Sequence, residues 1–279
     1  MQPLEDWAGP RRAALDQLLS ELFNDAWPEA FGAMGRYPLL TGGKRIRPLL
    51  CLAAHEAIAG TWEPALRPAA AIEMVHCYSL VHDDMPCMDD DAERRGKPTT
   101  HVQFGEDMAL LVGDALLTES FRILSRPWGD PAMQLELVRE LSTAAGYHGM
   151  IGGQAADLGA LGDITDVETL TRLHRGKTGA LIRCAVRMGA ITARANWEVL
   201  DGLTRYANHV GLAFQLADDV LDEEQDAGED GPPSFVKLLG VDETRRRAQA
   251  LAQEALDALG TLEAPVLRQL AQFSVERTI

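Results

Sequence analysis

Residues 69–81 read Ala-Ala-Ala-Ile-Glu-Met-Val-His-Cys-Tyr-Ser-Leu-Val, which is apolar around most of the circumference of a helix. Residues 210–221 have the same character. A helix without a wide polar face belongs at the centre of a bundle, where other helices cover it on all sides. These two segments therefore predict a helical protein with buried central helices.

The rest of the sequence agrees with this interpretation. Apolar residues recur at spacings of three and four, as one face of a helix requires, and the alternation typical of a strand is missing. No repeat or long linker divides the chain. We therefore expect an all-α fold in which residues 1–279 form a single-domain bundle, with helices over residues 47–59, 65–85, 108–124, 135–147, 170–191, 200–221 and 248–259.

Local signals predict where some helices begin and end. Thr165 and Glu168 have the spacing of a capping box, and Asp242 stands where a helix N-cap is expected. Helix breaks are expected at Gly42-Gly43, Pro127, Gly152-Gly153 and Gly231-Pro232-Pro233.

The composition argues against several classes of protein. A net charge of −16 at pH 7 disfavours binding to nucleic acid or anionic lipid. There is no run of about 18 uncharged apolar residues and no cationic start at the N-terminus, so we expect neither a membrane span nor a signal peptide. The four cysteines have no paired spacing, which indicates a reduced, cytoplasmic protein without a zinc site.

Two clusters of aspartates each end an apolar helical run: Asp83, Asp84 and residues 89–91, then Asp218, Asp219 and Asp222. Carboxylates this close repel one another, and the dipole at a helix C-terminus adds to the cost. One such cluster alone is typical of a solvated helix end. Two of them, on helices too apolar for the surface, indicate bound cations, and hard divalent ions prefer oxygen ligands.

The two clusters differ in their expected geometry. Asp218 and Asp222 are four residues apart and share one helix face, so both can bind within one metal shell. Pro86 disfavours helical geometry at Met85, and the first helix is therefore expected to end there. Residues 89–91 would then lie in a loop that can fold back toward the helix end.

Cations gather in two turns, Gly42-Gly-Lys-Arg-Ile-Arg-Pro48 and Arg94-Arg-Gly-Lys-Pro98. Alone, either turn is more often an ordinary surface feature. Glycines let a phosphate approach the backbone, and arginine forks bind phosphate oxygens bidentately. Beside acidic metal sites, the two turns therefore favour a bound diphosphate.

Two further residues are candidates on weaker grounds. His76 lies about two turns before Asp83, hence on nearly the same helix face, although a histidine in an apolar helix is as often a core residue. Lys177 lies within a helical run, where lysine usually reaches solvent. The adjacent Gly176 and Gly179 weaken the helix there and indicate an irregular, exposed backbone.

Together these residues resemble the bacterial-type short-chain trans-isoprenyl diphosphate synthases of the polyprenyl synthetase family. The resemblance implies a bundle of long helices around a deep central cavity, usually in a homodimer. The matching segments occur in the family's order and cover most of the chain: Gly42-Gly-Lys-Arg-Ile-Arg-Pro48, Glu73-Met-Val-His-Cys-Tyr-Ser-Leu-Val-His-Asp-Asp84, Arg94-Arg-Gly-Lys-Pro-Thr99, Gly113-Asp-Ala115, Gly152-Gly-Gln154, Gly176-Lys-Thr-Gly179 and Phe214-Gln-Leu-Ala-Asp-Asp219.

The resemblance also implies roles for individual residues. Three Mg²⁺ ions would join the aspartate motifs to an allylic diphosphate, with the ligands Asp83, Asp84, Asp89, Asp218 and Asp222. The catalytic group would comprise Asp83, Asp84, Asp89, Lys177, Asp218 and Asp219. The allylic diphosphate would be contacted by Arg94, Lys177, Thr178 and Gln215. The diphosphate of isopentenyl diphosphate would be held by Lys44, Arg47, His76 and Arg95.

The implied reaction is the head-to-tail 1'-4 condensation of isopentenyl diphosphate with dimethylallyl or geranyl diphosphate. Positive charge stabilises the departing diphosphate, and a dry apolar cavity protects the allylic carbocation from water. Tyr78 lies about 7.5 Å along the helix from Asp83, at about 1.5 Å per residue. In the family, a bulky aromatic there resembles the farnesyl synthases. An ordinary buried tyrosine is the equal alternative, so geranylgeranyl or geranyl diphosphate stays open as the product.

One segment departs from the family pattern. A lysine usually follows the second motif, but here the chain reads Asp230-Gly-Pro-Pro-Ser-Phe235, and Lys237 is the candidate substitute. The loss bears on allylic affinity more than on the class of reaction. The alternatives on the same fold are a terpene cyclase, a head-to-head synthase and a non-catalytic regulatory subunit. Cyclases typically lack the isopentenyl site, and regulatory subunits generally lose one aspartate motif.

Overall fold

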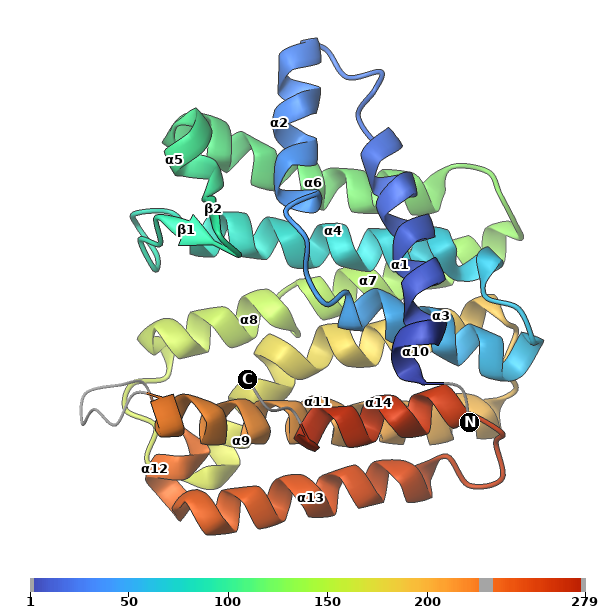
Figure 1. The fold of residues 1–279 in the computed structure, drawn as a ribbon, viewed down its shortest axis with the longest axis vertical. Helices are drawn as coiled ribbons and strands as arrows, with labels where there is room; N and C mark the ends of the chain where they lie inside the picture. Colours follow the sequence, from blue (N-terminus) through green and yellow to red (C-terminus); the bar gives the residue numbers. More distant parts are fainter. Residues whose placement is uncertain (1–2, 226–232, 277–279) are drawn as a thin grey trace.

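The computed structural model describes residues 3–225 and 233–276, most of which lie in helices that run across the molecule in stacked layers (Figure 1). The α-helices are α1 (Leu4–Glu21), α2 (Glu29–Leu39), α3 (Ile46–Ala59), α4 (Leu66–Asp83), α5 (Thr100–Phe104), α6 (Glu106–Ser125), α7 (Pro131–Ala145), α8 (Met150–Ala155), α9 (Val167–His174), α10 (Ala180–Thr192), α11 (Trp197–Gln225), α12 (Phe235–Leu239), α13 (Val241–Ala258) and α14 (Pro265–Glu276). Shorter helical turns are η1 (Glu63–Ala65), η2 (Ala156–Ala160) and η3 (Arg175–Gly179).

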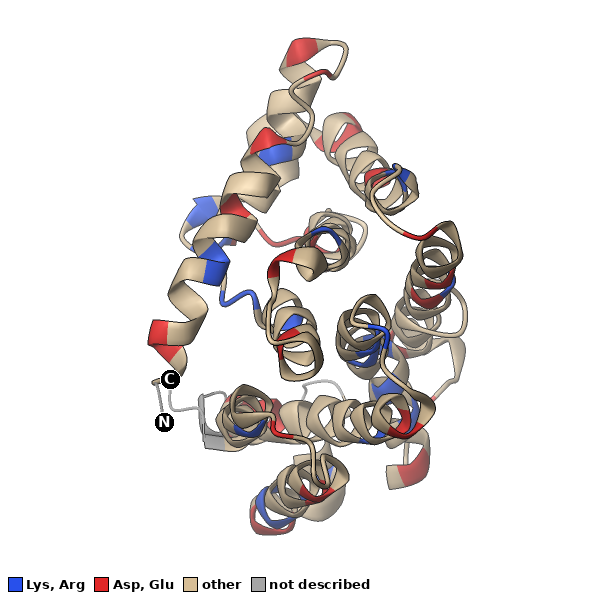
Figure 2. Ribbon diagram, turned by 90° about the vertical axis from the view of Figure 1, so that its right-hand side faces the viewer, with Lys and Arg blue, Asp and Glu red and all other residues tan. Residues whose placement is uncertain are grey.

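Three helices form the centre of the bundle. Most residues of α3, α4 and α10 are buried, and these helices contact one another. Figure 2, which looks along most of the helices, shows central helices enclosed by a ring of others. Residues 69–75 of α4 are all buried, and Ile72, Met74 and Val75 each contribute about 1.5–3 kcal/mol through burial. The predicted all-α bundle with an apolar central helix is confirmed.

The predicted run over residues 170–191 is helical throughout, but it is not α-helical throughout. The turn η3 separates α9 from α10 and winds as a π-helix, with one residue more per turn than its neighbours. The predicted break at Gly152-Gly153 is wrong, because both glycines lie inside α8. The glycines serve close packing instead: a Cβ on Gly153 would come within 2.2 Å of the backbone nitrogen of Lys177 in η3.

Both predicted N-caps are displaced, by one residue at α9 and by two at α13. Asp166, not Thr165, caps α9, and its Oδ1 accepts a hydrogen bond from the Thr169 N–H at 2.8 Å. The N-cap of α13 is Gly240, and Asp242 lies in the first turn of that helix. An acidic side chain is favourable both at the N-cap and in the first turn, so composition locates the helix start only to within two residues.

A small hairpin was not expected. The strands β1 (Glu93–Arg94) and β2 (Lys97–Pro98) pair antiparallel across a turn in which Arg95 and Gly96 have φ angles of 55° and 74°. Within the described residues, no helix is long and apolar enough to cross a membrane. All four cysteines are free, and three of them, Cys51, Cys77 and Cys184, are buried.

Candidate active site

The two aspartate clusters lie at the same end of the bundle. The carboxyl ends of α4 and α11 both point to the left in Figure 1, and α8 lies between them. The turn η3 contacts both α8 and α11. The fold thus brings together two segments that are more than 130 residues apart in sequence.

The first cluster is a helix end followed by a loop that folds back. The helix α4 ends at Asp83, two residues before the expected end at Met85. The backbone N–H of Asp89 donates to the carbonyl oxygen of Asp83 at 2.8 Å, which confirms the predicted return of the loop. Asp89 is exposed, whereas Asp84 is almost fully buried.

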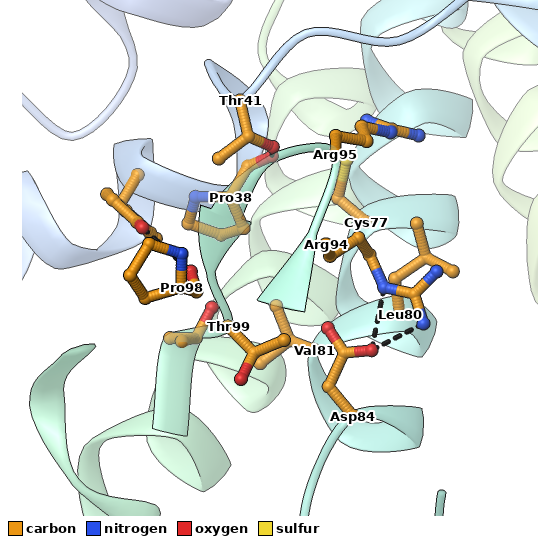
Figure 3. A pocket seen from close by; sticks show the side chains of 12 residues that line it. Pro38, Thr41, Cys77, Leu80, Val81, Asp84, Arg94, Arg95, Pro98 and Thr99 are labelled. Carbon is orange, nitrogen blue, oxygen red and sulfur yellow. Dashed lines mark hydrogen bonds and ion pairs between the residues drawn. The ribbon is translucent and has the colours of Figure 1, made fainter. Parts of the chain in front are cut away.

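Protein groups hold both aspartates at the end of α4. Arg94 Nε donates to Asp84 Oδ1 at 2.6 Å, and Figure 3 shows the guanidinium of Arg94 turned toward that carboxylate while Arg95 points away from it. Gln154 Nε2 donates to Asp83 Oδ1 at 3.1 Å. Burial raises the pKa of Asp83 to about 6, although the charge of nearby Lys177 works against that rise.

The three aspartates of the second cluster, on α11, differ in their exposure. Asp219 is buried, Asp218 is half-buried and Asp222 is exposed. Burial raises the pKa of Asp219, and hydrogen bonds from Gln215 and the Phe235 backbone oppose that rise. Gln215 Oε1 in turn accepts a hydrogen bond from Thr178 Oγ1 at 3.1 Å, so α11 is joined to η3 by side chains.

The aspartates do not form a finished metal site. Among the described residues, no group of three or more His, Cys, Asp or Glu side chains is arranged to hold a metal ion. The donor chemistry nevertheless fits Mg²⁺, because the candidate ligands are all carboxylates. Burial opposes the charged forms of Asp83 and Asp219, and a bound cation would relieve that cost at Asp83.

A basic cavity of about 420 Å³ lies beside the start of α3. All four residues expected to hold isopentenyl diphosphate line it: Lys44, Arg47, His76 and Arg95. Arg47 Nε is buried and has no hydrogen-bond partner in the described part of the chain, so it can take an anion. Burial, together with the charges of Arg47 and Arg95, lowers the pKa of His76 well below its usual value. His76 is therefore neutral at pH 7 and acts through hydrogen bonds.

A larger cavity of about 610 Å³ adjoins the first aspartate cluster. Its walls are mostly apolar, and its polar lining includes Arg47, His76, Asp83, Lys177 and Thr178. Arg47 and His76 line both cavities, so the two spaces share a wall.

Tyr78 also lines the larger cavity. Its buried hydroxyl has no hydrogen-bond partner within residues 3–225 and 233–276, and its ring meets the His82 ring edge-on at 5.8 Å between centroids. Seven of the predicted site residues line neither of these two cavities: Asp84, Asp89, Arg94, Gln215, Asp218, Asp219 and Asp222.

Sequence reasoning did not assign three residues that the structure places at the site. Gln154 contacts Asp83, Asp157 forms an ion pair with Lys177, and His82 lines the large cavity. Gln154 and Asp157 are three residues apart after a pair of glycines, a spacing that puts them on one helix face. The stretch from Asp230 to Pro232, where the family lysine is replaced, lies outside the described residues.

Comparison with known proteins agrees with this geometry. The model of the polyprenyl synthetase family matches residues 28–268. A dimethylallyltranstransferase of Fischerella ambigua (strain UTEX 1903) is 43% identical, covering 99% of this chain and 84% of its own. The farnesyl diphosphate synthase of Escherichia coli (strain K12) is 42% identical over 87% of each chain. The structure of an FPP/GFPP synthase from Zymomonas mobilis superposes with a TM-score of 0.90 and 41% identity over 98% of both chains. The chain belongs to the polyprenyl synthetase family.

Proposed function

We propose that this protein condenses isopentenyl diphosphate with an allylic diphosphate, dimethylallyl or geranyl, to form a short-chain prenyl diphosphate. One observation carries the proposal: a basic cavity and an apolar cavity share Arg47 and His76. Two anionic substrates with apolar tails need this arrangement, because their reacting carbons must meet while their diphosphates stay apart.

The proposed site residues divide the binding of the two substrates between them. Lys44, Arg47, His76 and Arg95 hold the diphosphate of isopentenyl diphosphate, with neutral His76 as a hydrogen-bonding group. Arg94, Lys177, Thr178 and Gln215 hold the allylic diphosphate. The apolar walls of the larger cavity exclude water from the allylic cation, and the double bond of isopentenyl diphosphate attacks that cation. The proton then lost passes to the released diphosphate.

Magnesium is part of the proposal. The candidate ligands are Asp83, Asp84, Asp89, Asp218 and Asp222, and three ions per site is the expected number. When bound, Mg²⁺ supplies positive charge that stabilises the departing diphosphate. Asp84 is paired with Arg94, and Lys177 with Asp157. Loading of the site therefore requires these ion pairs to exchange protein partners for substrate and metal.

We propose farnesyl diphosphate as the product, with Tyr78 limiting the space for the growing chain. The position of Tyr78 in the wall of the 610 Å³ cavity supports this assignment. Geranylgeranyl diphosphate is the second candidate, because a geranylgeranyl pyrophosphate synthase of Arabidopsis thaliana is also 42% identical over 80% of this chain.

We further propose a cytoplasmic homodimer that forms through α5 and α6. Val102, Leu110 and Leu111 on these helices are each about half exposed, at 52%, 48% and 48%. Leu110 also lines the large cavity, so a second copy on this face would remove water from the cavity wall. The four free cysteines support a reducing compartment.

The decisive assay incubates the purified full chain with Mg²⁺, dimethylallyl diphosphate and isopentenyl diphosphate, followed by chromatography of the dephosphorylated products. A linear C15 alcohol is the expected main product, and a C20 main product would replace farnesyl by geranylgeranyl. Cyclic hydrocarbons would favour a terpene cyclase. If no condensation occurs under any Mg²⁺ concentration, the proposed function is wrong.

A further inference from the structure

Both carboxylate oxygens of Asp219 already accept hydrogen bonds from protein groups. Oδ1 accepts from Gln215 Nε2 at 2.9 Å, and Oδ2 accepts from the backbone N–H of Phe235 at 2.7 Å. Asp219 is also only 7% exposed, so a hydrated ion has little access to the remaining lone pairs. Asp222, one turn further along α11, is exposed.

The hydrogen bonds of Asp219 determine the orientation of its neighbours. A carboxylate can only accept, so the amide NH₂ group of Gln215 must face Asp219. The amide oxygen of Gln215 is then left to accept from Thr178 Oγ1, as observed at 3.1 Å. One carboxylate thereby aligns Gln215 and Thr178, two residues that we place at the allylic diphosphate.

The other hydrogen bond fastens α12 to α11. Phe235 is the first residue of α12, where a backbone N–H has no partner within its own helix. Asp219 supplies that partner. Phe235 is 2% exposed, and its ring centroid lies 5.4 Å from that of His174. His174 is the residue directly before η3. Asp219 thus joins α11 to α12 directly and to η3 through Gln215 and Thr178, and Phe235 joins α12 to His174 at the end of α9.

We propose that Asp219 is a positioning residue and not a metal ligand: it fastens α12 and orients Gln215 and Thr178 toward the allylic diphosphate. This inference rests on the proposed function for the identity of the substrate. The hydrogen bonds that carry it are independent of that function.

Asp219→Asn separates the two roles. Asparagine keeps an oxygen for the Phe235 N–H, and if Gln215 turns over, the chain of hydrogen bonds to Thr178 is kept in reversed direction. The charge that a metal ligand needs is lost. Two Mg²⁺ concentrations are measured: the one that gives half-maximal activity, and the one that gives half of the rise in melting temperature when inorganic diphosphate is present. We expect both to stay within about twofold of wild type. A tenfold rise in either would overturn the proposal.

Asp219→Ala and Asp218→Asn complete the comparison. Asp219→Ala should speed amide hydrogen exchange at Phe235 about tenfold in the substrate-free protein and raise KM for the allylic substrate more than it lowers kcat. Asp218→Asn should raise the Mg²⁺ requirement and leave exchange at Phe235 unchanged. Unchanged exchange in Asp219→Ala would exclude the tether. If that variant does not fold, Asp219→Asn decides alone.

The two proposals fail in different ways. If the wild-type chain forms no condensation product, the proposed function is wrong, but exchange at Phe235 and the diphosphate-linked melting curves still test Asp219. If condensation occurs and Asp219→Asn needs far more Mg²⁺, only the role of Asp219 is wrong.

Discussion

Neighbouring residues of equal charge differ in function in the turn before α3. Both residues line the basic cavity, but Lys44 is exposed whereas Arg45 is only 3% exposed. Arg45 Nη1 donates to Glu73 Oε1 at 2.7 Å, in the middle of α4, and Arg45 adopts a left-handed φ of 53°. The buried ion pair thus sets the path of the turn that presents Lys44 and Arg47.

Substitution should separate these two functions. Arg45→Ala leaves the Glu73 carboxylate buried without its partner, and we expect a loss of about 3–5 kcal/mol in the free energy of unfolding. Lys44→Ala should change stability by less than about 0.5 kcal/mol but raise KM for isopentenyl diphosphate. Urea denaturation and steady-state kinetics measure the two effects. Equal stability of both variants would contradict the structural role of Arg45.

Tyr78 is the residue whose size should set product length. Tyr78→Ala removes a buried ring from the cavity wall, so the product should lengthen from C15 toward C20 or beyond, as measured by chromatography of the dephosphorylated products. Tyr147→Ala is the control, because Tyr147 is 91% exposed and its removal should leave the product unchanged. An unaltered product in Tyr78→Ala would remove Tyr78 as the limit.

Among the secondary-structure elements, the contact between α8 and η3 depends on the absence of side chains. Apolar periodicity predicted the long helices, because burial of one face is encoded every three or four residues. It did not predict the π-helical turn, and it did not predict the role of Gly153, which depends on the Lys177 backbone 24 residues further along the chain. A pair of glycines is typical both of a break and of close packing, and local sequence cannot distinguish them.

Gly153→Ala should therefore be damaging. Its Cβ would lie 2.2 Å from the Lys177 backbone nitrogen, so α8 and η3 must separate and Lys177 must move. We expect a loss of about 1–3 kcal/mol in stability, together with a lower kcat. Gly35→Ala in α2 is the control: the added atom meets only ordinary contacts with the Phe23 side chain, at 3.4 Å or more, and alanine should stabilise that helix by about 0.5–1 kcal/mol. A fully active Gly153→Ala variant would contradict this close contact.

The packing of α9 against α12 should make stability depend on pH. Burial lowers the pKa of His174 to about 4, and both ring nitrogens lack hydrogen-bond partners among the described residues. The unfolded chain binds the proton near pH 6.5, so this stabilisation is complete above that pH and is lost as pH falls toward 4, by up to about 3 kcal/mol. Melting curves of His174→Leu between pH 4 and 7 should lack this component. Parallel pH profiles for both proteins would exclude it.

At the scale of the whole molecule, the exposed apolar face of α5 and α6 should hold two copies together. Sedimentation of the wild type should give about twice the chain mass of 30.4 kDa. Leu111→Asp should shift the protein toward monomer and lower activity, because the cavity wall then faces water. Leu161→Asp is the control, since Leu161 is also exposed, at 56%, but lies outside this face. A dimeric Leu111→Asp variant would place the interface elsewhere.

The sequence by itself determined the helical class, the apolar central segment at residues 69–81, and the acidic and basic residue types of the candidate site. These features are local, because periodicity, helix ends and charge clusters are written in neighbouring residues. The tertiary structure decided which aspartates are buried and which are exposed, that Arg47 and His76 line two cavities, and that Asp219 accepts a hydrogen bond from Phe235. Burial and hydrogen bonding between distant segments decide such questions, and both arise only when the helices are packed against one another.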